Sequence, residues 1–140
     1  MRKIISLALG VTILATAPLL AANRPNPKAE AELAKAIAGR IEGKPVDCIY
    51  LRDIRSSRII DGTAILYETS NRKLYVNRPD SGHSSLRRDD ILVTNTHSPQ
   101  LCSIDIVRLV DSGAWFERGF VGLGKFVPYT KPPKVPVPAS

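Results

Sequence analysis

Three arginines at a regular spacing are the most conspicuous chemical feature of this sequence. Arg52, Arg55 and Arg58 follow one another at every third residue of the segment RDIRSSR. On a turn or a short helix this spacing would bring the side chains together, and guanidinium groups bind phosphate or carboxylate bidentately. They are therefore a candidate anion-binding site. The alternative, which we favour, is that the arginines form ion pairs with nearby aspartates on a solvated face. Those aspartates are Asp47, Asp53 and Asp61.

No arrangement of residues typical of an enzyme is evident. His83 lies in a serine-rich loop beside Ser81 and Ser84. A nucleophile, its base and an orienting group must converge in space, however, and neighbours within one loop seldom do so. The nucleophile-elbow pattern Gly-x-Ser-x-Gly is missing as well. His97 is interpreted as a loop or strand-end residue rather than a base, and the sequence predicts no catalytic residue and no cofactor.

The amino-terminal segment has the pattern of a secretory signal peptide. Residues 1–3 give a basic start, and residues 4–22 contain no charge and end in small residues. We predict that residues 1–22 are cleaved, and that the mature chain is exported without a transmembrane helix, to the periplasm if the source is Gram-negative. The alternative is a membrane anchor, because a run of about 19 apolar residues could just span a bilayer. Pro18 interrupts the run and favours the cleaved signal.

The predicted export determines how the two cysteines are interpreted. In an oxidising environment a pair of cysteines most often forms a disulfide. A bond between Cys48 and Cys102 would close a loop of about 55 residues, which the chain-entropy model equates with about 4 kcal/mol. A metal site is not predicted, because only His83 and His97 accompany the cysteines and no ligand spacing is present.

The charge of the chain favours anionic partners. The full chain has 20 Lys and Arg against 13 Asp and Glu, and removal of Arg2 and Lys3 leaves 18 against 13. Such a balance favours acidic lipids, lipopolysaccharide or acidic polymers. Because the signs are interspersed and the chain is predicted to be exported, nucleic acid is not an expected partner.

The first element of the mature chain is predicted to be a helix over residues 27–42. Asn26 fits the N-cap and Pro27 the first helical position. Gly43 and Pro45 fit its end. An apolar stripe along one face predicts that the helix covers a sheet, and a partner-binding or membrane-surface role is the alternative. The stripe consists of Ala29, Leu33, Ile37 and Ile41.

The rest of the chain predicts antiparallel strands. Residues 58–79 form a meander with a hairpin turn at Asp61-Gly62, and residues 63–69 are apolar on both faces, as in a central strand. Further strands are predicted at 48–51, 91–94, 101–110 and 120–129, with a bend at the glycines of the last. The predicted fold class is α+β: one N-terminal helix packed on a curved, mainly antiparallel sheet of 5–7 strands, a partly closed barrel being one such form. The domain spans 23–130, and 131–140 is a proline-rich tail.

Trp115 and Phe116 lie between the last two predicted strands. They are either an exposed recognition pair or a plug in the core, and we favour the plug.

The strand segments also resemble a known family. The segments CIYLRDIRSSRIIDGTAILYE, KLYVNRP, QLCSIDIVRLVD and RGFVGLGKFVPY, over residues 46–128, are similar to a family of small exported proteobacterial proteins known only as a domain of unknown function. Members often have two further cysteines, at places occupied here by residues such as Ser81 and Val121. Their joint absence is consistent with those two pairing with each other, which implies the Cys48–Cys102 bond. The family has no established activity, so the resemblance implies no catalytic residue.

The sequence leaves two candidate functions. The first is a non-enzymatic periplasmic binding or envelope-associated module, with a basic face for an anionic envelope component or a protein partner. The second is a small periplasmic hydrolase with dispersed catalytic residues. The first is favoured because no acid–base or nucleophile arrangement is present.

Overall fold

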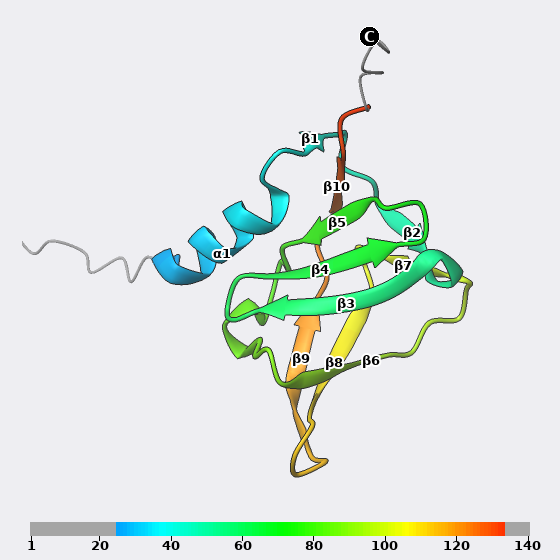
Figure 1. Ribbon diagram of the computed structural model, residues 1–140. Coiled ribbons are helices and arrows are strands. Elements are labelled where there is room, and N and C mark those ends of the chain that lie inside the picture. Colours follow the sequence, from blue (N-terminus) through cyan, green and yellow to red (C-terminus); the bar gives the residue numbers. More distant parts are fainter. Residues whose placement is uncertain (1–24, 134–140) are drawn as a thin grey trace, which may run out of the picture.

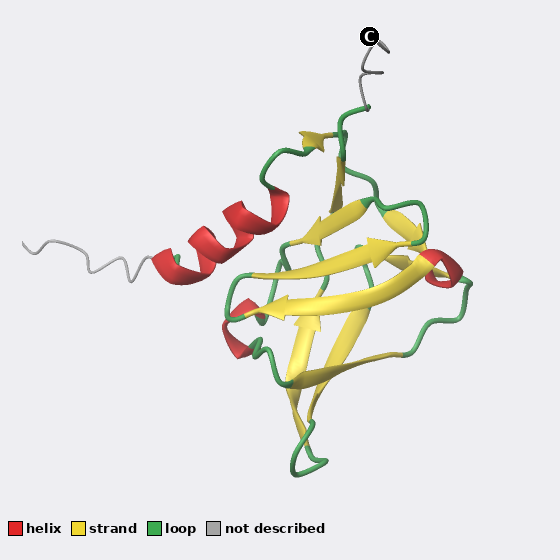
Figure 2. Cartoon of the chain, in the orientation of Figure 1, coloured by secondary structure: helices red, strands yellow, loops and turns green. Residues whose placement is uncertain are grey.

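The computed structural model describes residues 25–133 (Figures 1 and 2), so the predicted signal peptide at 1–22 and most of the tail at 131–140 lie outside the described residues. The helical elements are α1 (Pro27–Ile37) and two single-turn 3-10 helices, η1 (Leu51–Asp53) and η2 (His83–Ser85). The strands are β1 (Ile41–Glu42), β2 (Cys48–Tyr50), β3 (Ile54–Ile60), β4 (Ala64–Thr69), β5 (Leu74–Asn77), β6 (Asp90–Thr94), β7 (Gln100–Cys102), β8 (Ile106–Asp111), β9 (Glu117–Gly122) and β10 (Phe126–Thr130). None of the described helices is long and apolar enough to cross a membrane.

The strands form three antiparallel sheets. The largest has the order β1-β10-β5-β4-β3, the second has the order β6-β8-β9, and β2 pairs with β7. One N-terminal helix and antiparallel strands confirm the predicted class at this level. The predicted number of strands is wrong, because the described residues form ten. Some of these, such as β1 and β2, are two or three residues long and too short to leave a pattern in the sequence.

The core lies on both faces of the five-stranded sheet. Along β4, Ala64 and Leu66 face the cluster under α1, whereas Ile65 and Tyr67 face the cluster shared with the other sheets. Both clusters are buried at their centres, with Ile65 and Ala64 completely inaccessible to solvent. The predicted central strand with two apolar faces is therefore confirmed.

The helix begins where the sequence predicts and ends earlier. The Asn26 side chain accepts a hydrogen bond from the Lys28 backbone N–H, and Pro27 is the first helical residue. The predicted end at residue 42 is wrong. The helix ends at Ile37, the chain turns through Gly39 with φ +70°, and Ile41 pairs with Thr130 of β10. Ile41 is consequently 55% exposed instead of lying on the apolar stripe.

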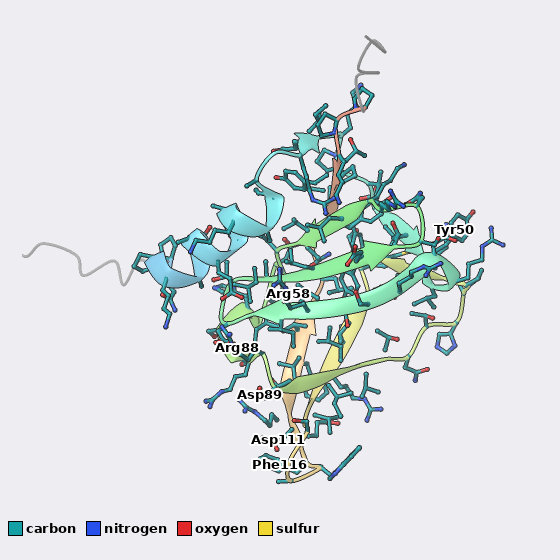
Figure 3. The ribbon with its side chains drawn as sticks, in the orientation of Figure 1. Tyr50, Arg58, Arg88, Asp89, Asp111 and Phe116 are labelled. Atoms are coloured by element: carbon teal, nitrogen blue, oxygen red, sulfur yellow. A yellow bond between two sulfur atoms is a disulfide. The ribbon has the colours of Figure 1, made fainter. Side chains whose placement is uncertain are left out.

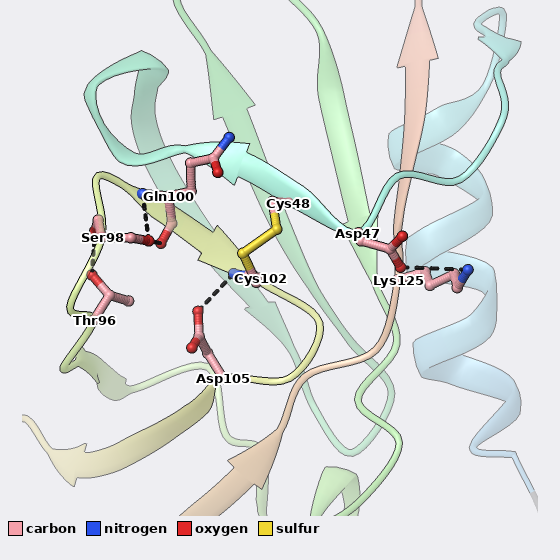
Figure 4. Close-up of a disulfide and its surroundings, with 8 residues drawn as sticks. All are labelled: Asp47, Cys48, Thr96, Ser98, Gln100, Cys102, Asp105 and Lys125. Carbon is pink, nitrogen blue, oxygen red and sulfur yellow. Dashed lines mark hydrogen bonds and ion pairs between the residues drawn. A yellow bond between two sulfur atoms is a disulfide. The ribbon is translucent and has the colours of Figure 1, made fainter.

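Two further predicted strands are interrupted. The predicted strand at 101–110 is divided into β7 and β8, because Asp105 closes a turn. Its side chain accepts from the Cys102 backbone N–H at 2.7 Å, and its own N–H donates to the Cys102 carbonyl at 3.0 Å (Figure 4). The predicted last strand is divided into β9 and β10, which confirms the bend predicted at its glycines.

Asn77 holds that bend in place. Its side chain is fully buried, and its amide donates to the Gly124 carbonyl at 2.6 Å while its carbonyl accepts from the Gly124 N–H at 3.2 Å. A side chain at position 124 would collide with the Arg78 carbonyl oxygen. The bend carries the chain from the three-stranded sheet into the five-stranded one.

The Cys48–Cys102 disulfide is present, as predicted (Figure 4). The two cysteines face each other across the β2–β7 pair, and Ile49 and Leu101, the next pair of residues, are buried in the core. The bond therefore links the two strands of the short β2–β7 sheet, whose buried residues pack into the core.

We expect removal of the disulfide by the double variant Cys48→Ala/Cys102→Ala to lower the free energy of unfolding by up to about 4 kcal/mol, because the bond restricts a long loop in the unfolded chain. Urea unfolding of the mature chain measures the change, and the unreduced wild type should offer no thiol to an alkylating reagent. A loss below about 1 kcal/mol would contradict the chain-entropy argument.

The helix is also tied down by ion pairs, one of which should be visible in the pH dependence of stability. The Arg78 guanidinium donates two hydrogen bonds of 2.7 Å to the Glu30 carboxylate, and these bonds chiefly hold the pKa of Glu30 below its ordinary value of 4.5. A lowered pKa in the folded state stabilises the fold above pH 4.5, and this contribution disappears as the pH falls through the folded pKa.

We expect Glu30→Gln to lose up to about 1 kcal/mol of stability at neutral pH, since the pair is partly exposed, and to show a shallower fall in stability on acidification. Chemical unfolding at several pH values measures both effects. Glu68→Gln is the control, because Glu68 is an exposed glutamate on β4 for which the described residues show no ion pair. An equal effect of the two variants would contradict the assignment to Glu30.

Candidate functional site

The structure separates the three arginines of the predicted anion site. Arg52 lies on η1, whereas Arg55 and Arg58 lie on β3, which begins at Ile54, before the predicted start of the meander at residue 58. In an extended strand, residues three apart are separated by about 10 Å, so the arginines cannot close on one phosphate as they would on a turn or helix. The prediction that local structure gathers them is wrong. Arg55 and Arg58 place positive charge along β3, with Arg52 on the turn before it, and we call these three residues the arginine row.

The predicted ion pairs account for only one of these arginines. Arg52 lies 3.8 Å from Asp53 and above the ring of Tyr50, with 5.0 Å between the guanidinium carbon and the ring centroid. The other two predicted partners are engaged elsewhere. Asp61 accepts from the backbone N–H and side chain of Arg88, which lies beneath the helix in Figure 3, and Asp47 pairs with Lys125 in Figure 4.

Arg55 and Arg58 are therefore exposed cations for which the described residues show no ion pair. Arg58 projects from the same face of the sheet as α1. It borders a hollow of about 360 Å³ beside Leu66 and Leu74, whose side chains belong to the core cluster under the helix. Arg55 lies at an irregularity in the β3–β4 pairing, where the register shifts between Ile54 and Ser56.

β3 is the last strand of its sheet, and β6 is the last strand of the other. Each therefore has one edge at which no strand pairs with its backbone. The two edges flank a groove of about 210 Å³, which we call the β3–β6 groove. It is lined by Leu51, Ile54, Ser57, Tyr67, Leu92, Thr94 and Leu101.

Backbone hydrogen bonds close both ends of this groove. Beyond the end of β3, the Gly62 N–H donates to the Leu86 carbonyl at 3.0 Å, and before its start the Leu51 N–H donates to the Pro99 carbonyl at 3.0 Å. Leu86 precedes β6 and Pro99 follows it, so β3 and β6 run in opposite directions. Between these fastened ends the two strand edges stay apart, with the core as the floor.

Tyr67 contributes an unusual polar atom to the groove. Its side chain is 3% exposed, and its hydroxyl has no hydrogen-bond partner among the described residues. Burial raises the pKa of this phenol, so it stays protonated across the physiological range. A buried hydroxyl without a partner costs about 1–3 kcal/mol. Sequence reasoning missed Tyr67 and the groove, since neither has a local signature in the chain.

Trp115 and Phe116 are exposed, so the prediction of a core plug is wrong. Trp115 is 75% exposed and Phe116 is 54% exposed, and both lie in the turn between β8 and β9. Figure 3 shows Phe116 at the tip of this projecting hairpin. The strands pair as far as Val110 and Glu117, and the turn beyond them extends past the core. The Asp111 side chain accepts from two backbone N–H groups of the turn and holds it in this position.

The neighbouring sheet face is apolar as well. Phe120 lies opposite Arg108 in the β8–β9 register, and the solvent face that they share continues to exposed apolar residues on β6 and β8. Apolar residues at both odd and even positions of the segment IVRLV were the sequence signal for this face. The exposed large apolar residues of this region are Ile91, Ile104, Ile106, Trp115, Phe116 and Phe120.

The two histidines lie in separate parts of the described structure. His83 is in η2, and His97 is on the exposed loop between β6 and β7. Within residues 25–133 there is no group of three or more His, Cys, Asp or Glu side chains that could hold a metal ion.

Because Trp115 is the only tryptophan of the chain, its exposure can be measured directly. We expect acrylamide to quench its fluorescence almost as strongly in the native protein as in urea. Trp115→Ala should change the free energy of unfolding by no more than about 0.5 kcal/mol. The control is Phe126→Ala, which removes a fully buried ring and should cost about 3–5 kcal/mol. Strong protection from acrylamide would show that this tip is covered.

Comparison with protein-family models, with curated proteins and with solved structures found no match to this chain. The resemblance to a family of exported proteobacterial proteins therefore stays a prediction. No residue takes a role from a relative, and a functional assignment has to follow from the geometry of the arginine row, the groove and the aromatic hairpin.

Proposed function

We propose that this chain is an exported, non-enzymatic binding module that contacts an anionic partner through Arg55 and Arg58 on the free edge of β3. The observation that supports it is the pair of exposed guanidinium groups for which the described residues show no ion pair. Guanidinium is the side chain best suited to bidentate contact with carboxylate or phosphate. Free cations on an unpaired strand edge are accessible to such a group.

The location of the protein follows from two features. The disulfide is typical of an oxidising compartment, and the predicted signal peptide at 1–22 would deliver the chain there. An envelope contains acidic lipids, glycans and protein segments, and the positive net charge of the mature chain would steer them towards the surface. The site of action is proposed to be the periplasm in a Gram-negative source.

The shape of the molecule is proposed to be one curved sheet that does not close. The β9–β10 bend joins the two larger sheets on one side of the core, whereas β3 and β6 do not pair on the other. The arginine row lies at this open seam. A binding contact at the seam would engage charge and free backbone groups together.

A second candidate is a protein contact through the hairpin tip and the adjacent apolar face. Trp and Phe are favoured at the energetic centres of protein interfaces, and both are exposed here. The predicted alternative, a hydrolase with dispersed residues, stays open as a proposal, and turnover in a hydrolase panel would support it.

The proposal predicts that charge reversal on β3 specifically weakens binding to polyanions. We expect Arg55→Glu/Arg58→Glu to bind polyglutamate or phosphatidylglycerol vesicles at least about tenfold more weakly than the wild type at low salt, because two contacting cations become repulsive. Binding is measured by calorimetry for polyglutamate and by co-sedimentation for vesicles.

The matched control is Lys44→Glu/Lys131→Glu, which changes the net charge equally at exposed residues that follow β1 and β10, at the other edge of the five-stranded sheet. It should weaken binding far less. An equal loss in both variants would mean that only net charge matters, and wild type that binds neither probe would contradict the proposed function.

A further inference from the structure

We propose that the β3–β6 groove binds a short extended segment of another polypeptide, which adds as a strand between β3 and β6 and carries acidic side chains on its outward face. This inference rests on the proposed function and names the class of the anionic partner. The segment would be recognised by backbone pairing and by side-chain pockets together, as when extended peptides bind exposed sheet edges.

The backbone argument comes from the two free edges. Alternate residues of an edge strand direct their N–H and C=O groups away from their only partner strand. Here two such edges face one groove, and hydrogen bonds at Gly62 and Leu51 close its ends. Because β3 and β6 run in opposite directions, an added strand would be antiparallel to one edge and parallel to the other. The exposed stretch of β3 from Arg55 to Arg58 spans about 10 Å, which can pair with about four residues of an added segment.

The floor of the groove favours apolar side chains with one hydrogen-bonding contact. Its volume of about 210 Å³ is below the roughly 300–1,000 Å³ of typical small-molecule sites, so it suits single side chains of a peptide. Ile54, Leu92 and Leu101 supply apolar walls. The Tyr67 hydroxyl, buried and without a partner among the described residues, can donate to a carbonyl or hydroxyl of the inserted segment.

The outward face selects for acidic residues. Ser57 lines the groove, whereas Ser56 and Arg58 line the hollow on the helix side, so side chains of β3 alternate between the two faces. An added strand alternates in the same way, and its outward side chains would lie beside Arg58. Edge charges of one sign also discourage pairing with an identical edge. A second copy of β3 would place arginine against arginine, whereas an acidic strand would not.

The probe is the synthetic peptide acetyl-Glu-Val-Glu-Val-Glu-Val-Glu-amide, titrated into the mature protein by calorimetry with amide exchange followed by NMR. We expect saturable binding, with slowed exchange at edge amides in Ser56–Arg58 and Leu92–Thr94. The control peptide has the same sequence with N-methyl groups on its valines. It keeps every side chain and charge but loses three backbone donors, and it should bind at least about tenfold more weakly, as loss of several hydrogen bonds implies.

Two protein variants test the groove itself. Ser57→Phe places a ring in the groove from an exposed position and should abolish peptide binding. Tyr67→Phe removes only the unpartnered hydroxyl, so it should leave stability unchanged or higher while weakening peptide binding about 2- to 10-fold. A Tyr67→Phe protein that binds the peptide as tightly as the wild type would show that the hydroxyl is not part of the site.

The outcomes separate this inference from the proposed function. If the peptide and its N-methyl form bind equally, contact is by charge alone, so strand addition is wrong while the basic edge survives. If the peptide fails to bind although polyglutamate binds and responds to Arg55→Glu/Arg58→Glu, strand addition is again wrong. If neither probe binds the wild type, both proposals fail.

Discussion

The architecture depends on the paired hydrogen bonds between the Asn77 side chain and the backbone of Gly124. A fully buried amide is costly unless both its donor and its acceptor are satisfied, and here a single residue of the bend satisfies both. The contact holds β5 against the turn between β9 and β10, where Arg78 comes too close for any side chain at position 124. Through this bend the chain leaves one sheet and enters the other beside β5. Backbone hydrogen bonds between Ser81 and Gly122 reinforce the junction.

The β9–β10 connection joins the two larger sheets on one side of the core, and on the other side the sheets end in unpaired strands. β9 and β10 are consecutive in the chain, whereas β3 and β6 are separated by the hairpins of the meander and a long loop, and they meet only as unpaired edges. The disulfide-linked β2–β7 pair contributes Leu101 to one end of the groove between them. Bonds at both ends prevent the edges from spreading, and nothing among the described residues fills the middle. The same seam carries the exposed arginines, so backbone groups, an apolar floor and positive charge occur together here.

Elements that depend on neighbouring residues were predictable. The Asn26 cap, the Asp61-Gly62 turn and the bend at the glycines of 120–129 each follow from local backbone preferences, and each is present. Elements that depend on a distant partner were not. The helix pattern continues to Ile41, but β10 pairs with that residue from 89 positions along the chain and takes it out of the helix. Residues 55–58 are polar and lack alternation, because a strand at a sheet edge faces water, and so the sequence predicted the meander to start only at residue 58.

The candidate site likewise has features that the sequence predicts and features that only the fold creates. The sequence by itself determined that the two cysteines would pair, and it predicted which residues could bind an anion, because residue chemistry and the predicted compartment suffice for these inferences. Only the tertiary structure decided that Asp47 and Asp61 form ion pairs with other cations, that the aromatic pair lies on a projecting hairpin, and that the buried Tyr67 lines a groove. The physical reason is that ion-pair partners, exposure and cavities are properties of surfaces brought together across the chain, and no local pattern encodes which edges are left unpaired.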